Sequence, residues 1–234
     1  MEGLKRLIDH APLFPPASLG MGAAVAEDAR ARASEHSWML ARFVCPASRL
    51  TELEGAMEPD GAPALSVVLD GGDWRDTPFR VEAVEMVGVS REDLADVETF
   101  CEVQLDDEAL RYALGAVAAV GAKAKVRCGG AHVPSEERLA AFIVAARAAD
   151  VAWKATAGLH HPVRTEREHG FLNLLEAVGL AEEGADEAAL RTVLAERDPA
   201  ALRGAAERPR GRFVSIGSCS FIEPVEDLQG LGLL

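Results

Sequence analysis

Residues 122–128 read AKAKVRC, and this stretch decides which kind of parallel sheet the chain forms. Side chains alternate across a strand, so Lys123, Lys125 and Arg127 lie on one face and small or apolar residues lie on the other. A strand that helices cover on both faces is apolar on both. The single charged face therefore indicates a closed barrel, in which the apolar face meets the helices and the charged face lines a polar centre.

Two further segments show the same alternation. In residues 99–105 (TFCEVQL), Glu102 lies opposite the apolar side chains, and in residues 151–157 (VAWKATA), Lys154 shares a face with Thr156. Three strand-like segments with one polar face each are typical of a barrel with a charged interior. We therefore expect a polar centre in this barrel.

Strand-like and helical segments alternate along the chain, which predicts βα units and an α/β fold. Further strands are expected over residues 39–45, 64–70, 81–87 and 213–219, and helices over residues 106–120, 134–150 and 168–202, the last one broken near Gly184. We predict a (β/α)8-type, TIM-like barrel formed by a single domain over residues 1–234. The connections on either side of residues 81–87 are short for full helices.

The N-terminal region, residues 1–36, is predicted to be an arm followed by a helix. Residues 1–16 have the composition of an irregular arm, and Ser18 is a suitable N-cap for the helix. Only seven strands are evident in the whole sequence. The eighth strand either lies within residues 168–212 or is absent, in which case the barrel is incomplete or irregular.

Composition narrows the class of protein. The chain has 234 residues, 49% of them hydrophobic and 26% charged, which is globular usage, and its net charge is −14. An acidic surface argues against nucleic acid as a partner. No stretch approaches the roughly 18 apolar residues of a membrane span. The four cysteines form no C-x-x-C pair, so we expect reduced thiols in a cytoplasmic protein.

The expected active site lies at the C-terminal ends of the strands, as in other barrels of this type. Glycine-rich strand ends let backbone N–H groups approach an anion, although glycine also serves simply to make tight turns. The residues expected to bind substrate or its anionic group are Arg127, Gly129, Gly130, Thr156, His169, Asn173, Gly217, Ser218 and Ser220.

Lys154 is the first candidate for catalysis. Burial and neighbouring cations lower the pKa of an amine, and a neutral amine can attack a carbonyl and form a Schiff base. The alternative is an ion pair with Glu102 or Glu85 that holds Lys154 charged, as a structural or substrate-binding group. The expected catalytic set is Lys154, Lys125, Glu102, His160 and His161.

The histidines and one cysteine allow other chemistry. His160, His161 and His169 together with Glu102 contain the donor types of a metal site, although adjacent histidines on an extended segment point in opposite directions. A histidine can equally serve as general acid or base. Cys219 precedes a short helix whose N-terminus could lower a thiol pKa, but a small buried cysteine is the simpler interpretation.

Two short segments resemble deoxyribose-phosphate aldolases, which are class I (Schiff-base) barrels. Residues 153–158 (WKATAG) are similar to the Lys-x-Ser-Thr-Gly strand of that family, and residues 215–220 (SIGSCS) to its last-strand segment. The resemblance implies a Schiff base on Lys154 and phosphate binding at the second segment. The family's second lysine, on the strand that follows, has no counterpart here, and Lys125 is the substitute from the preceding strand.

A broader similarity connects the chain to a family of bacterial (β/α)-barrel proteins for which no reaction is known. It rests on residues 13–17 (LFPPA), 154–162 (KATAGLHHP), 169–173 (HGFLN) and 217–221 (GSCSF). This similarity spans most of the chain and implies the barrel fold, but it implies no activity.

Three functions remain as hypotheses. The first is an aldolase- or lyase-like enzyme that acts on a small anionic carbonyl or sugar-phosphate-like compound, with Lys154 as Schiff-base or carbonyl-polarising residue. The second is a metal-assisted hydrolase or isomerase that uses the histidines. The third is a non-catalytic sensor of a small molecule. The first needs no cofactor, the expected partner is a small anionic substrate, and a homo-oligomer is left open.

Overall fold

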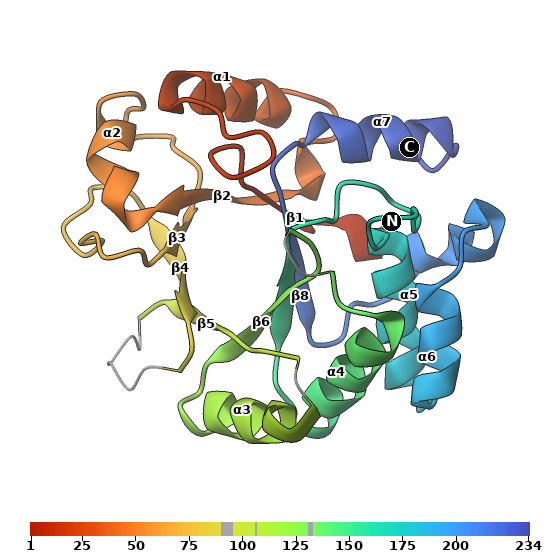
Figure 1. Cartoon of the computed structure of the whole chain (residues 1–234). Coiled ribbons are helices and arrows are strands. Elements are labelled where there is room, and N and C mark those ends of the chain that lie inside the picture. Colours follow the sequence, from red (N-terminus) through yellow and green to blue (C-terminus); the bar gives the residue numbers. More distant parts are fainter. Residues whose placement is uncertain (90–95, 106, 131–132) are drawn as a thin grey trace.

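The computed structural model describes residues 1–89, 96–105, 107–130 and 133–234. Eight parallel strands close into a barrel in which each strand pairs with its neighbours along the chain and β8 pairs with β1 (Figure 1). The predicted (β/α)8-type barrel is thus confirmed. The strands are β1 (Ile8–His10), β2 (Leu40–Pro46), β3 (Leu65–Val68), β4 (Val81–Val87), β5 (Glu98–Glu102), β6 (Lys123–Arg127), β7 (Trp153–Thr156) and β8 (Phe213–Ser218).

The strand that closes the barrel lies in the N-terminal arm, and the prediction that placed it within residues 168–212 is wrong. In β1, Ile8 pairs with Leu40 of β2 and with Ile216 of β8. The strand has three residues, of which two, Asp9 and His10, are polar. So short a strand has no alternation that a sequence pattern can detect, and its structure depends on the two strands beside it.

The helices surround the barrel on most sides (Figure 1). The segment over residues 168–202, expected to carry one or two helices with a break near Gly184, forms two helices and the start of a 3-10 helix, η4 (Pro199–Glu207). The α-helices are α1 (Met21–Arg32), α2 (Leu50–Glu54), α3 (Asp107–Ala119), α4 (Glu136–Ala148), α5 (Phe171–Glu182), α6 (Glu187–Leu194) and α7 (Ile222–Gly230).

Two helix starts show how local sequence sets the boundaries. Helix α4 begins where predicted, because the Ser135 side chain accepts a hydrogen bond from the Arg138 amide and glutamates occupy the first turn. Helix α1 begins at Met21 and is capped by Gly20, so the expected start at Ser18 is wrong. Ser18 has a left-handed backbone, with φ of 45°, in the turn that precedes the helix.

The barrel is irregular between β3 and β4, where Figure 1 shows a loop in place of a helix. The described residues between β3 and β4 form no helix, and neither do those between β4 and β5. The short connections seen in the sequence predicted this.

The apolar face of the sheet packs against the helices. Trp153 of β7 stacks on Phe213 of β8, with ring centroids 4.4 Å apart, and meets the edge of Phe142 from α4 at 5.0 Å. All three rings are buried. This part of the hydrophobic core therefore lies outside the barrel, between the strands and the helices. None of the helices in the described part of the chain has both the length and the apolar character to cross a membrane.

Candidate active site

The charged faces predicted from the sequence point into the barrel. Lys125 and Lys154 are direct neighbours in the register between β6 and β7, and both are buried. Opposite them, β1 contributes Asp9 and β4 contributes Glu85, which are also buried. Four other strands separate β4 from β1 in one direction around the ring and two in the other. The closed barrel is therefore what brings these four charges together.

Lys154 is held by two carboxylates. Its Nζ donates hydrogen bonds to Oδ2 of Asp9 at 2.5 Å and to Oε1 of Glu85 at 2.7 Å. The hydroxyl of Ser215 donates to the same oxygen of Asp9, and that of Ser66 to the same oxygen of Glu85, both at 2.7 Å. Every member of this network is hydrogen-bonded, as a buried charged network requires.

The carboxylates keep Lys154 in its charged form. Burial disfavours the ammonium, but Asp9 and Glu85 outweigh it and raise the pKa of Lys154 above its ordinary value. Burial also disfavours the Glu85 carboxylate, yet Lys154, Lys125 and the hydrogen bonds lower the pKa of Glu85 to about 2. The expected low pKa of Lys154 is wrong, because the sequence does not reveal that two carboxylates from distant strands surround the amine.

Lys125 forms the second half of the network. Its Nζ lies 3.1 Å from Oε2 of Glu102 and 3.5 Å from Oε2 of Glu85. Glu85 therefore contacts both lysines, whereas Glu102 contacts Lys125 and not Lys154. Of the two ion pairs that the sequence allowed for Lys154, the structure contains the one with Glu85.

A second set of charges lies below this network, nearer the N-terminal ends of the strands. Arg42 of β2 lies 3.6 Å from Asp9 and 2.5 Å from Glu98, and Glu98 also pairs with Lys123 at 2.5 Å. The ring of Phe100, which is fully buried, has its centroid 5.3 Å from Nζ of Lys154. Alternating charges thus extend along the interior, packed around one aromatic ring.

A pocket of about 460 Å³ opens at the C-terminal ends of the strands, directly above the lysines. Lys154, Lys125 and Glu85 line it from the barrel interior, and Arg127 and His160 line it from nearer the rim. The pocket thus brings together titratable groups from three strands, β4, β6 and β7, and from the loop after β7. Its other lining residues include Ala11, Phe14, Pro15, Pro16, Val44, Val68, Gly130, Thr156, Ala157, Gly158, Glu168, Gly217 and Cys219.

The glycines at the rim of this pocket allow close approach of the backbone. A side chain at Gly129 would place its Cβ 2.6 Å from Cα of Gly158, so the loops after β6 and β7 approach each other closely only because both residues are glycine. Gly130 and Gly217 line the pocket and Gly129 does not. An anion-binding role therefore stays a prediction for Gly130 and Gly217, while the close approach explains Gly129.

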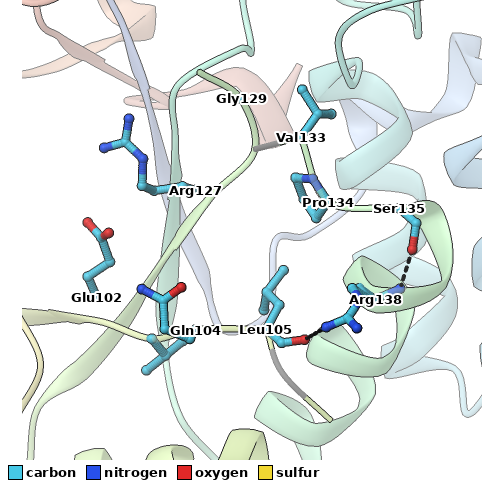
Figure 2. A pocket seen from close by; sticks show the side chains of 10 residues that line it. Glu102, Gln104, Leu105, Arg127, Gly129, Val133, Pro134, Ser135 and Arg138 are labelled. Carbon is cyan, nitrogen blue, oxygen red and sulfur yellow. Dashed lines mark hydrogen bonds between the residues drawn. The ribbon is translucent and has the colours of Figure 1, made fainter. Parts of the chain in front are cut away.

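A second pocket, of about 640 Å³, adjoins the first between the end of β5 and the start of α4 (Figure 2). Figure 2 shows Glu102, Gln104 and Arg127 on one side of it and Val133 and Pro134 on the other. Arg127, an exposed residue, lines both pockets. Its guanidinium is thus available to a ligand in either one.

The histidines do not converge. His160 lines the first pocket, with Nδ1 3.7 Å from Sγ of Cys219 and 3.7 Å from Oε2 of Glu223. His161 points elsewhere and pairs with Asp227 of α7 at 2.7 Å. Among the described residues, no group of three or more His, Cys, Asp or Glu side chains is arranged to hold a metal ion. The geometry gives no support to the metal-site hypothesis.

His169 and Asn173 lie outside the pocket, contrary to the expectation that they bind substrate. The ring of buried His169 hydrogen-bonds through Nε2 to the carbonyl of Pro134 at 2.8 Å, and burial lowers its pKa. The amide of Asn173 donates to the carbonyls of Val193 and Glu196, each at 2.8 Å. His169 thus links the segment before α5 to the segment before α4, and Asn173 links α5 to the end of α6, where backbone carbonyls need partners.

The Gly-Ser loop after β8 is also largely occupied with its own structure. The Ser218 hydroxyl donates to the carbonyl of Ser220 at 2.7 Å, and the Ser220 hydroxyl accepts from the amide of Glu223 at the start of α7. Neither hydroxyl lines the pocket. Burial raises the pKa of the Cys219 thiol, which agrees with the simpler interpretation of a small buried cysteine and not with the alternative of a thiol pKa lowered by the helix N-terminus.

Sequence reasoning missed four members of the network: Asp9, Ser66, Ser215 and Arg42. Asp9 and Arg42 lie on strands whose polar residues interrupt apolar runs, LIDHA and MLARFVC. A charged residue inside an otherwise apolar strand was the available signal. Ser66 and Ser215 carried no signal, because isolated serines are common on strands.

Comparisons with known proteins place the chain in no family. A scan of protein-family models finds no match, and a search of curated proteins finds none either. Among solved structures, the chain is similar to the apo form of a "putative deoxyribose-phosphate aldolase" from Toxoplasma gondii ME49, with a TM-score of 0.49 and 12% sequence identity, over 98% of this chain and 94% of that one. The barrel assignment rests on the strand pairing described above and not on this likeness.

Proposed function

We propose that the chain is an aldolase- or lyase-like enzyme that acts on a small carbonyl compound carrying an anionic group. The observation that carries the proposal is the Lys154 ammonium, held between Asp9 and Glu85 at the base of a pocket. An ammonium has three N–H donors, and Lys154 has two acceptors among the described residues. The third N–H is left for an oxygen of the substrate.

The geometry favours carbonyl polarisation over a Schiff base for Lys154. A Schiff base needs a neutral amine, whereas the carboxylates raise the pKa of Lys154. A fixed ammonium instead stabilises the negative charge that develops on the carbonyl oxygen when an adjacent C–H or C–C bond breaks. Lys125, held by Glu102, is the second cation beside that oxygen.

Two other residues complete the proposed reaction. His160 lines the pocket and is the candidate that takes a proton from the α-carbon or returns one to it. Arg127 binds the anionic group of the substrate, because a guanidinium matches the geometry of carboxylate and phosphate oxygens. Gly130, Thr156 and Gly217 line the space between these groups.

The test is exchange of α-protons for deuterium, followed by NMR in D₂O, on a panel of aldehydes and ketones that carry a carboxylate or phosphate. We expect the wild type to catalyse exchange, and we expect the exchange rate to fall about 10²–10³-fold in Lys154→Met. Arg111→Met, an exposed change on α3, is the control that retains activity. Because Lys154→Met removes a buried cation and can fail to fold, His160→Gln at the pocket edge is the second variant, expected to slow exchange while the protein stays folded.

A borohydride experiment separates the two roles of Lys154. With only four lysines in the chain, peptide mass spectrometry assigns any trapped adduct to one of them. Polarisation predicts no adduct on Lys154 under conditions in which exchange occurs. An adduct on Lys154 would overturn the polarising role in favour of the Schiff base.

One observation favours a non-catalytic sensor as the second candidate. Lys154 is fully buried and both partners hold it in place, which is also what a purely binding or structural network requires. A sensor predicts that members of the panel raise the melting temperature with no exchange and no bond cleavage. If no member of the panel shows exchange and none raises the melting temperature, both candidates are refuted.

A further inference from the structure

A separate cavity lies at the opposite end of the barrel from Lys154. It has a volume of about 230 Å³ and is formed by the segment before β1 together with the N-terminal ends of β2 and β8. Four cationic side chains line it, Lys5, Arg6, Arg42 and Arg210, with one carboxylate, Glu2. This is unexpected in a chain with a net charge of −14.

Arg42 gives the cavity a buried charged wall. It is 6% exposed, and carboxylates on β4 and β5 hold part of its guanidinium. Its Nε lies 3.3 Å from Oε2 of Glu82, but not in the geometry of a hydrogen bond, and it has no hydrogen-bond partner among the described residues. One N–H of a buried guanidinium at this cavity is thus unused, and such a group is costly to leave without an acceptor.

Arg210 adds a charge that no carboxylate neutralises directly. Its guanidinium donates to the carbonyls of Lys5 at 2.9 Å and Val214 at 2.7 Å. In the described part of the chain, no carboxylate lies within ion-pair distance of Arg210. Burial lowers its pKa, which reflects the cost of this arrangement. The carbonyls fix the guanidinium in position, and Asp9 and Glu2 act on its positive charge only from beyond ion-pair distance.

The charge and the volume of the cavity together define which ligand it can hold. Asp9, Glu82 and Glu98 compensate Arg42, and Glu82 also pairs with Arg6. Among the residues that line the cavity, Glu2 is then the one carboxylate for Lys5 and Arg210. The surplus charge at the cavity is therefore positive. At about 230 Å³ the cavity is smaller than the roughly 300–1,000 Å³ of sites for drug-sized ligands. A small, compact anion satisfies both conditions, and guanidinium groups bind oxyanions through paired N–H donors.

We propose that this cavity is a second binding site, specific for a small, multiply charged oxyanion and distinct from the pocket above Lys154. Arg42 and Arg210 form its fixed wall, and Lys5 closes it from the solvent side. The site does not depend on the proposed enzymatic function, because it shares no lining residue with the first pocket.

The test is isothermal titration of inorganic phosphate into the full chain, at ionic strength held constant with chloride. Wild type is compared with Lys5→Glu, which reverses one exposed charge at the cavity, and with Arg30→Glu, an equivalent reversal at an exposed position of α1. We expect Lys5→Glu to weaken binding about tenfold or more and Arg30→Glu to leave it nearly unchanged. Arg127→Met, which alters only the pockets at the C-terminal ends of the strands, should also retain binding.

Three results would overturn the proposal. The first is the absence of phosphate binding at millimolar concentration in the wild type. The second is an equal loss of phosphate affinity in Lys5→Glu and Arg30→Glu, which would mean that the net charge of the protein and not the cavity attracts the anion. The third is loss in Arg127→Met with retention in Lys5→Glu, which would place phosphate in the pocket above Lys154. Arg210→Gln is a further variant that should abolish binding, with circular dichroism as the check on its folding.

Discussion

The ionisation of Glu85 makes a prediction that isolates the interior network. Its pKa is about 2 in the folded protein against an ordinary value of 4.5, and the gap corresponds to about 3 kcal/mol at roughly 1.4 kcal/mol per tenfold change in the acid constant. Because the folded pKa is the lower one, this stability is present above about pH 4.5 and is lost as the pH falls towards 2. Solvent screening does not reduce this contribution to the stability, since Glu85 is buried.

The assay is urea unfolding of wild type and Glu85→Gln at several pH values. The glutamine cannot ionise, so the stability difference between the two proteins should shrink by about 2 kcal/mol between about pH 7 and about pH 3. Glu58→Gln, at an exposed position, is the control that should show no such trend. A difference that stays constant over this range would refute the reasoning, because Glu85 would then titrate alike in the folded and unfolded chains.

Three further predictions concern the same interior and its rim. Lys154→Met should cost about 3–5 kcal/mol of unfolding free energy, measured in urea, because it leaves two buried carboxylates without their cation; a cost near zero would contradict this. Gly129→Ala should lower the melting temperature, since its Cβ would lie 2.6 Å from Gly158, whereas Gly204→Ala, with open space around it, should not. Burial raises the pKa of Cys128 to about 12, so iodoacetamide at about pH 8 should label this thiol only after unfolding, and rapid labelling of the native protein would argue against its burial.

The sequence by itself determined that the barrel has a polar interior. In residues 122–128, charged side chains recur at every second position on one face, and in residues 151–157 Lys154 and Thr156 share a face; a closed sheet with helices outside accommodates such faces. These local patterns identified Lys125 and Lys154 as interior residues before any partner was known. They did so because the alternation of a strand is independent of what the strand packs against.

Only the tertiary structure decided what surrounds Lys154. Asp9 and Glu85 are 145 and 69 positions away from it along the chain, and the ring closure by β1 brings them to the amine. The sign of the pKa shift depends on these partners, since burial acts against the ammonium and the carboxylates act for it. Local patterns report the face on which a residue lies, whereas the charge state of a buried residue depends on contacts between distant segments.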